Sequence, residues 1–388
     1  MTGDKDPILP PGYNYDFINA EMLTKARVVN ERIVLASGAS YAVLVLPPKE
    51  TMRPEILKKI VALVADGACV LGNAPTHSPS GHDYPFCDTR VQALAKELWG
   101  FKMVGKGHVF SGIALKKVLR QLGVAEDCIL GNDFLYTHRQ EGYAHIYFVS
   151  NQLEIARKDT IAFRVTGMQP ELWDAVTGQI KTLPNYAISN GRTVIPLEFG
   201  PGDSWFIIFR NRAIVDDWNE NFEQFRPVQA IEGNWTVDFN PGYAKPFQAT
   251  FPQLTDWSDH TDPQIKYYSG TATYSRTFTY DGKKDSSLYL DLGQVEGLAT
   301  IRLNGKEYPT LWRYPYRVNI SSQLQPGENK LEVSVVNCWW NRLVGDAQPG
   351  AKPVTWTAPR RCFPTCSAID HAATRARAAK TGRSSRLL

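Results

Sequence analysis

The apolar positions between residues 41 and 130 alternate between short continuous runs and helical spacing. Residues 41–46 form a continuous apolar run that ends in two prolines, as a buried strand of a parallel sheet would. Residues 52–65 then place apolar side chains at helical spacing. Further strands are predicted at 68–72 and 106–112, and further helices at 90–98 and 114–122. This alternation predicts a doubly wound, Rossmann-type, flavodoxin-like α/β domain over residues 12–130.

Sheets of this class often bind nucleotides through a glycine-rich phosphate-binding loop. The glycine-rich fingerprint should follow the first strand, where the chain instead reads PPKETM. Gly105 and Gly107 precede a predicted strand and do not open a helix. The sequence therefore favours a scaffold over a nucleotide site.

From Asp133 onwards the apolar period becomes two, which is typical of half-buried antiparallel strands. The predicted strands cover 135–138, 144–150, 160–165, 171–174, 193–197 and 204–210. Turns rich in Gly, Pro, Asn and Asp separate them, which predicts an antiparallel β-sandwich over residues 131–212. The polar stretch 213–231 is predicted to be a surface linker.

A second all-β domain is predicted over residues 232–357. Its strands are expected at 235–239, 270–279, 287–292, 298–303 and 330–337. Asn304-Gly305 after the apolar end of one strand is a strong hairpin signal. The number and spacing of these strands predict a jelly roll.

Composition and charge narrow the functional classes. Hydrophobic residues make up 43% of the chain and charged residues 21%, and no apolar run approaches 18 residues, so we expect no membrane partner. No signal peptide is predicted at the start of this chain. Residues 358–388 hold seven basic side chains and one acidic one, so the remainder of the +4 chain has a net charge of −2. This distribution argues against nucleic acid as a partner.

The cysteines give no sign of a disulfide framework or a zinc site. Cys69, Cys128 and Cys338 lie in apolar or element-end contexts, where we expect buried free thiols. Cys362 and Cys366 stand in the basic tail without a matching second pair or a suitably placed histidine.

Several stretches together resemble one family of enzymes. Tyr15-Asp-Phe-Ile-Asn19 combines with SYAVLVLPPKETMRPEILKKIVALVADGACVLG and with FRVTGMQPELWDAVTGQI. Over residues 12–357 the chain resembles glycoside hydrolase family 106, the α-L-rhamnosidases. The stretch that includes LYLDLGQVEGLATIRLNGKEY is similar to the family's galactose-binding-like jelly roll, and to the corresponding domain of family 2 glycosidases.

The resemblance implies the C-terminal, accessory portion of such an enzyme. Family members carry a catalytic (β/α)8-type barrel before these domains, and no family catalytic glutamate can be carried over onto this sequence. The implied partners are carbohydrate and the missing catalytic barrel, no cofactor is required, and relatives are typically exported to the periplasm or beyond. Two alternatives stay open: a glycosidase active as this chain, using Asp256, Asp259 or Glu171, and a non-catalytic polysaccharide-binding module.

The family pattern ends after Thr357, where related chains continue into a closing strand. This chain continues with APRRCFPTCSAIDHAATRARAAKTGRSSRLL, which is rich in Ala, Arg, Ser and Thr. A shifted reading frame would give such a composition, and a genuine basic extension is the alternative. Under both interpretations residues 358–388 are predicted to be an aberrant, disordered tail.

Residues 256–262 (DWSDHTD) form the first candidate site. Sugar sites combine hydrogen-bonding side chains with an aromatic face, which Asp256, Trp257, Asp259 and His260 offer. An oxygen-rich loop of this kind also suits a structural calcium ion. The structural alternative is a loop in which the aspartates cap turns and the tryptophan fills the core.

Two aromatic–arginine groups and one histidine–arginine pair complete the candidates. The aromatic groups lie in 312–317 and 339–342, where rings stack on a sugar or a second domain, or else pack inside the sandwich under arginines. Their candidate residues are Trp312, Arg313, Arg317, Trp340 and Arg342. His138 and Arg139 end a predicted strand opposite His145, and they either reach substrate or a neighbouring domain, or form the polar end of a hairpin.

Overall fold

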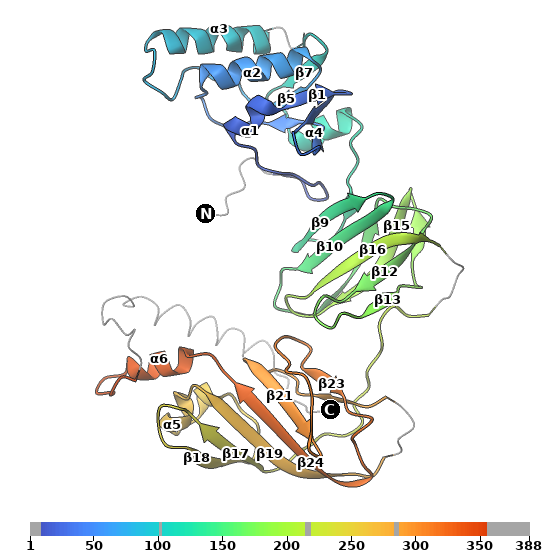
Figure 1. Ribbon diagram of the computed structural model, residues 1–388, viewed down its shortest axis with the longest axis vertical. Helices are drawn as coiled ribbons and strands as arrows, with labels where there is room; N and C mark the ends of the chain where they lie inside the picture. Colours follow the sequence, from blue (N-terminus) through green and yellow to red (C-terminus); the bar gives the residue numbers. More distant parts are fainter. Residues whose placement is uncertain (1–8, 101–102, 214–218, 283–286, 355–388) are drawn as a thin grey trace. The chain divides into compact units, whose positions relative to one another are not determined.

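The computed structural model describes residues 9–100, 103–213, 219–282 and 287–354 (Figure 1). The chain divides into two compact units, residues 1–222 and 223–388. Two hydrophobic cores belong to the first unit and one to the second. Part of the predicted linker, the two tail cysteines and the predicted disordered tail lie outside the described residues.

The first unit opens with an α/β body whose sheet has the order β4-β5-β7-β6 (Figure 1). Its strands are β4 (Leu44–Val45), β5 (Cys69–Leu71), β6 (Met103–Val104) and β7 (Gly107–Phe110). Its helices are α2 (Pro54–Ala65), α3 (Phe86–Gly100) and α4 (Leu115–Gln121). Strands β4, β5 and β7 pair in parallel and β6 pairs antiparallel with β7. The predicted α/β alternation is present, whereas the flavodoxin-like topology stays a prediction.

Helix α2 provides much of the core of this body. Its stripe of Leu57, Ile60, Leu63 and Val64 is buried, as the helical spacing requires. Strand β7 lies directly against the C-terminal end of this helix. A Cβ atom at Gly107 would lie 2.3 Å from the carbonyl oxygens of Val64 and Ala68, so glycine is required there.

The prediction of one strand over 41–46 is wrong. A small antiparallel sheet, β1-β2-β3, precedes the parallel one, and Tyr41 ends its third strand. The strands are β1 (Arg27–Val29), β2 (Arg32–Val34) and β3 (Ser40–Tyr41), after helix α1 (Ala20–Lys25). Residues 42–43 break the backbone pairing, and only Leu44–Val45 enters the parallel sheet. One apolar run therefore serves two sheets, which its periodicity does not reveal.

The rest of the first unit is an antiparallel sandwich, as predicted. A five-stranded sheet of order β13-β12-β16-β10-β9 faces a four-stranded sheet of order β14-β15-β11-β8. The strands are β8 (Cys128–Ile129), β9 (Phe134–Glu141), β10 (Ala144–Asn151), β11 (Arg157–Phe163), β12 (Met168–Trp173), β13 (Ile180–Thr182), β14 (Ala187–Ser189), β15 (Arg192–Phe199) and β16 (Ser204–Arg212). Tyr147, Phe163 and Phe209 are fully buried at its centre. Strands β8, β13 and β14 were not predicted, because they are only two or three residues long.

The described residues 219–231 of the predicted linker are anchored at two points, one in each unit. Asn221 is buried, and its side-chain amide donates to the carbonyl oxygens of Asn185, at 2.7 Å, and Pro196, at 3.1 Å. Its side-chain oxygen accepts from the Asn185 backbone amide, and Lys181 donates to its carbonyl oxygen. In the second unit, Ile231 belongs to the hydrophobic core.

The second unit is an all-β domain built on a six-stranded sheet of order β18-β17-β19-β24-β21-β22, with a two-stranded sheet β20-β23. Its strands are β17 (Trp235–Asn240), β18 (Phe247–Phe251), β19 (Thr271–Tyr280), β20 (Tyr289–Asp291), β21 (Leu298–Leu303), β22 (Lys306–Glu307), β23 (Arg317–Asn319) and β24 (Gly327–Val336). Short helices are η1 (Trp257–Asp259), α5 (Pro263–Lys266) and α6 (Trp340–Asp346). Asn304 and Gly305 both have positive φ between paired Leu303 and Lys306, which confirms the predicted hairpin.

The described cysteines are all free thiols. Cys69, Cys87 and Cys128 are buried, whereas Cys338 is exposed, so the prediction of a buried thiol is wrong there. Cys338 follows the end of β24, beyond the last pairing of that strand, and therefore lies outside the core. Among the described residues, no helix is long and apolar enough to cross a membrane.

Candidate functional site

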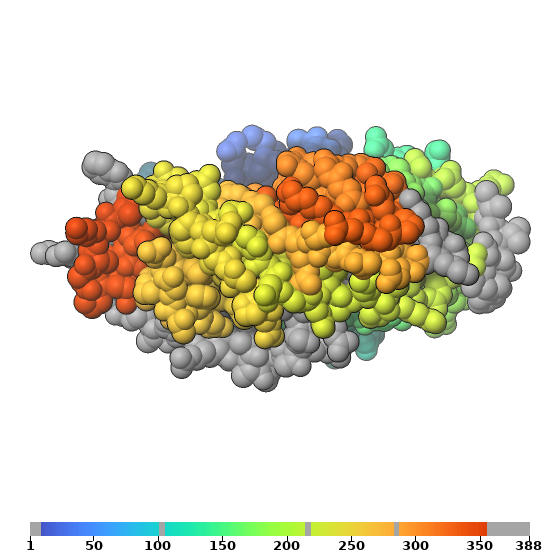
Figure 2. Space-filling view, turned by 90° about the horizontal axis from the view of Figure 1, so that it is seen from below, coloured from blue at the N-terminus to red at the C-terminus, as the bar shows by residue number. Residues whose placement is uncertain are grey.

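Strand register gathers three predicted sugar-site segments at one end of the second unit. The last residue of β24 pairs with the first residues of both β19 and β21. Residues 256–262 lie before β19, and residues 339–342 follow β24. A bridge between Ala299 and Leu311 brings the loop with Trp312 to the same end. Helix α6 marks this end of the second unit in Figure 1, and its segment is the red group at the left of Figure 2.

Within residues 256–262 the side chains mainly cap turns and fill the core. The Asp256 carboxylate accepts from the Ser258 backbone amide at 2.8 Å, and thereby caps η1. Trp257 is 7% exposed, and its indole N–H donates to the Tyr274 hydroxyl at 2.5 Å. Its ring face is therefore closed to a ligand. Asp259 is exposed and His260 half-buried.

The loop offers little to a metal ion. Asp262 caps α5 by accepting from the Gln264 backbone amide, and its own amide donates to His260 Nδ1 at 3.0 Å. In the part of the chain that the structure describes, no group of three or more His, Cys, Asp or Glu side chains is placed to hold a metal. Structural calcium stays a prediction.

In the aromatic–arginine groups, rings are exposed while two arginines serve the fold. Trp312 is 58% exposed and Trp340 is 47% exposed. Arg317 pairs with Asp291, and its guanidinium lies 4.0 Å from the centre of the Phe225 ring. Arg342 pairs with the buried Asp346 at 2.7 Å, and Arg313 is half-buried. Tyr314 and Trp339 of the same groups are exposed as well, so these four rings are the parts of the groups that a sugar can meet.

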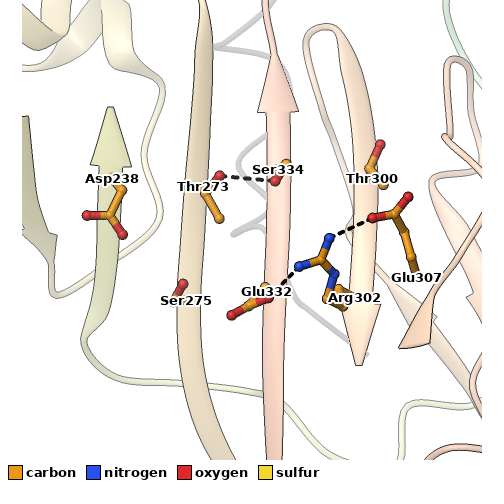
Figure 3. Close-up of a pocket in the computed structure, with 8 residues that line it drawn as sticks. All are labelled: Asp238, Thr273, Ser275, Thr300, Arg302, Glu307, Glu332 and Ser334. Carbon is orange, nitrogen blue, oxygen red and sulfur yellow. Dashed lines mark hydrogen bonds and ion pairs between the residues drawn. The ribbon is translucent and has the colours of Figure 1, made fainter. Parts of the chain in front are cut away.

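A polar hollow on the outer face of the six-stranded sheet was not predicted (Figure 3). Its lining residues come from β17, β19, β24, β21 and β22: Asp238, Thr273, Ser275, Thr300, Arg302, Glu307, Glu332 and Ser334. Arg302 pairs with Glu307 at 2.8 Å and with Glu332 at 3.6 Å. Polar residues at every second position were its only signal, and this pattern is shared by any solvated sheet face. None of the predicted site residues within the described ranges lines this hollow.

Glu171, a predicted catalytic alternative, is fully engaged in the sandwich. Its buried carboxylate accepts from the Trp173 indole at 2.9 Å, the Arg210 Nε at 3.1 Å and the Asn211 side chain at 2.8 Å. Burial alone would raise the pKa of Glu171, but these donors outweigh it and lower the pKa. A general acid of a glycosidase needs the opposite shift.

His138 belongs to a polar network at one end of the sandwich core. Its Nδ1 lies 2.8 Å from an Asp127 oxygen, and its Nε2 lies 3.0 Å from Nδ1 of His145. The other Asp127 oxygen accepts from Arg164 at 2.8 Å. The Tyr147 ring stacks on His138 at a centroid distance of 3.9 Å.

The sheet separates His138 from the predicted partner next to it. Adjacent residues of a strand point to opposite faces, so Arg139 lies exposed on the outer face while His138 lies under the core rings. Arg139 is instead close enough to Tyr41 to affect its pKa, which Asp16 raises to about 12 by accepting a hydrogen bond from the tyrosine hydroxyl. His138 and Arg139 therefore do not form a pair, because their side chains lie on opposite faces of the sheet.

Comparison with known proteins places these features in a family context. Residues 1–188 match the family model of glycoside hydrolase 106, α-L-rhamnosidase, and residues 256–372 match the galactose-binding-like domain of glycosyl hydrolase 2. The structure resembles that of a rhamnosidase from Novosphingobium sp. PP1Y, with a TM-score of 0.73 and 37% identity over 90% of this chain and 34% of that one. These matches confirm the predicted resemblance.

Other relatives agree more weakly. A putative β-glucuronidase of Formosa agariphila is 23% identical, covering 89% of this chain and 50% of its own length. A β-glucuronidase of Ruminococcus gnavus shares 22% identity over 28% of this chain and 21% of its own, with a TM-score of only 0.25. The chain thus spans half of the curated relative and about a third of the Novosphingobium rhamnosidase.

Proposed function

We propose that this chain, whose residues 1–188 match the α-L-rhamnosidases of glycoside hydrolase family 106, is the accessory portion of such an enzyme and does not itself hydrolyse glycosides. The observation that supports this best is the engagement of Glu171, the only predicted catalytic carboxylate that is buried. Its donors hold it ionised, as a structural ion pair requires. A glycosidase needs one carboxyl group that stays protonated to act as the acid.

The carboxylates of the polar hollow also suit a structural role better than catalysis. Glu307 and Glu332 both form ion pairs with the Arg302 guanidinium, at 2.8 Å and 3.6 Å. Asp238 accepts from Gln248 at 2.7 Å. The hollow offers hydrogen-bonding groups for sugar hydroxyls but no aromatic ring to stack on a sugar.

The test is an assay of the purified chain with an aryl α-L-rhamnoside and, because one relative is named a β-glucuronidase, an aryl β-D-glucuronide. We expect no turnover above buffer for either substrate. Turnover that disappears in Glu171→Gln, Glu307→Gln or Glu332→Gln would show that the chain is a glycosidase. The exposed Glu21→Gln serves as the matched control, since it removes a charge from the surface of α1.

The contact with carbohydrate is proposed for the end of the second unit that carries Trp312 and Trp340. Both rings are exposed, and exposed tryptophans bind the apolar face of sugars. Calorimetric titration of the chain with L-rhamnose and pectic oligosaccharides should show a heat of binding. Trp312→Ala or Trp340→Ala should reduce this heat several-fold. Tyr143→Ala, at an exposed aromatic of the first unit, is the control. Equal binding by all variants would contradict this assignment.

A further inference from the structure

The polar hollow of the second unit is formed by two rows of side chains that cross the six-stranded sheet (Figure 3). In the first row, strand register places four residues side by side: Asp238, Thr273, Ser334 and Thr300. Two positions further along the strands, it aligns the second row: Ser275, Glu332, Arg302 and Glu307. The hollow has a volume of about 480 Å³, within the range of roughly 300–1,000 Å³ that is usual for small-molecule sites.

Most polar groups of the hollow are bound to one another. The hydroxyl oxygens of Thr273 and Ser334 lie 3.0 Å apart. Arg302 donates to Glu307 at 2.8 Å, and its guanidinium lies 3.6 Å from the Glu332 carboxylate. These contacts hold the side chains of both rows in position without a ligand, as a preformed site requires.

Asp238 is the exception among the charged groups. One of its carboxylate oxygens accepts from the Gln248 side chain at 2.7 Å. In the part of the chain that the structure describes, no Lys, Arg or His pairs with Asp238. Figure 3 shows its carboxylate at one end of the first row, on the far side of the hollow from the ion pair between Arg302 and Glu307. The second oxygen of this exposed carboxylate is therefore open to a ligand that carries a positive charge.

The charge and the composition of the lining select the class of ligand. Three carboxylates and one guanidinium line the hollow, and Lys330 pairs with Glu332 at 2.8 Å from outside it, so the net charge is −1. This balance disfavours an anionic ligand. No aromatic ring lines the hollow, so stacking cannot hold a sugar there. The hydroxyl and carboxylate oxygens instead suit a ligand rich in O–H and N–H donors.

We propose that the hollow binds an amino sugar, with its ammonium group on Asp238 and its hydroxyls on the neighbouring serine and threonine hydroxyls. An ammonium group has three donors and no acceptor, so it fits a carboxylate that lacks a cation. The hydroxyls of the sugar and of the lining can each donate and accept. Trp312 and Trp340 do not line the hollow, so this site is distinct from the proposed carbohydrate contact at the end of the unit. It also does not depend on whether the chain hydrolyses glycosides.

Three ligands with closely similar rings, D-glucosamine, D-glucose and D-glucuronate, test the role of charge. Each is added to the native chain near pH 6, and the backbone amide resonances of Thr273, Ser275 and Ser334 are followed by NMR. We expect saturable shifts with glucosamine at about millimolar concentration, weaker shifts with glucose and none with glucuronate. Ammonium chloride should not reproduce the shifts.

Several results of this titration would overturn the proposal. They are equal shifts with glucosamine and glucose, binding of glucuronate, and shifts that ammonium chloride alone produces. Shifts of the tryptophan indole resonances without shifts of the three amides would support the carbohydrate contact at the end of the unit and show that the hollow is not a site. The absence of any shift would refute both assignments.

The role of Asp238 is tested by Asp238→Asn, which removes the charge and keeps the shape. It should weaken glucosamine binding roughly two- to fivefold, as expected for an exposed ion pair, and change glucose binding less. Added salt should weaken glucosamine binding by the native chain more than by the variant. Glu296→Gln is the matched control, because this exposed carboxylate also accepts from a glutamine side chain, at 3.2 Å, but does not line the hollow. If Asp238→Asn binds glucosamine as tightly as the native chain does, the proposed site is wrong.

Discussion

Replacing Glu171 by glutamine should destabilise the sandwich strongly for an isosteric change. The new NH₂ group would face at least one of the donors of Trp173, Arg210 and Asn211, which leaves a buried donor without an acceptor. Losing one partner of a buried ion pair costs about 3–5 kcal/mol, and a hydrogen bond to a charged group contributes about 1.5–3 kcal/mol. Arg210 is 43% exposed, so water compensates in part. We expect a loss of about 2–3 kcal/mol.

The measurement is urea unfolding followed by tryptophan fluorescence, which Trp173 reports from inside the network. Glu141→Gln, at an exposed position of the same sheet, should change the free energy of unfolding by no more than about 0.5 kcal/mol. Because the folded pKa of Glu171 lies below its ordinary value of 4.5, its stabilisation is present above that pH and is lost as the pH falls below it. The two proteins should therefore converge in acid. Equal stability of the native chain and Glu171→Gln at pH 7 would refute this account.

Three further outcomes are expected. Ile301→Ala should cost roughly 2–5 kcal/mol by leaving a cavity, and in calorimetry it should shift only the transition of the second unit. Because the folded pKa of His145 is lowered, the unfolded chain binds more protons below pH 6.5, so the first unit should lose stability as the pH falls through that value, and less so in His145→Gln. In a background without the two tail cysteines, a thiol reagent should label Cys338 in the native chain, whereas Cys69 and Cys128 should react only on unfolding.

The fold could be predicted where a long element buries one face. Helix α2 and strands β10, β17 and β21 show the expected periods, because each presents a continuous stripe to a core. Very short strands such as β13 and β14 were missed, since two or three residues define no period. The break at residues 42–43 was missed because the strand residues on both sides of it are apolar, with Tyr41 in the antiparallel sheet and Leu44–Val45 in the parallel one.

The candidate sites show the limit of sequence reasoning more clearly. Trp257 and Trp312 stand in similarly polar segments, yet one ring fills the core and the other is exposed. His145 was predicted to lie opposite His138 and does contact it, whereas Arg139 points to the other face of the sheet. The second partner of His138 is Asp127, just before β8, which the sequence did not indicate. Contacts of this kind depend on register and on the meeting of two sheets, and a single sequence specifies neither.

Asn221 has a consequence for protein engineering. Its side chain donates hydrogen bonds to the carbonyl oxygens of Asn185 and Pro196, and so holds the chain to the first unit just before that unit ends at Phe222. Truncation after residue 222 therefore keeps these hydrogen bonds, whereas truncation before Asn221 would leave the carbonyl oxygens of Asn185 and Pro196 without their donor. The boundary therefore suits domain fusions. A foreign domain joined after residue 222 would begin beside a residue whose position is fixed by hydrogen bonds to the first unit. The first unit could also be produced alone with these hydrogen bonds intact.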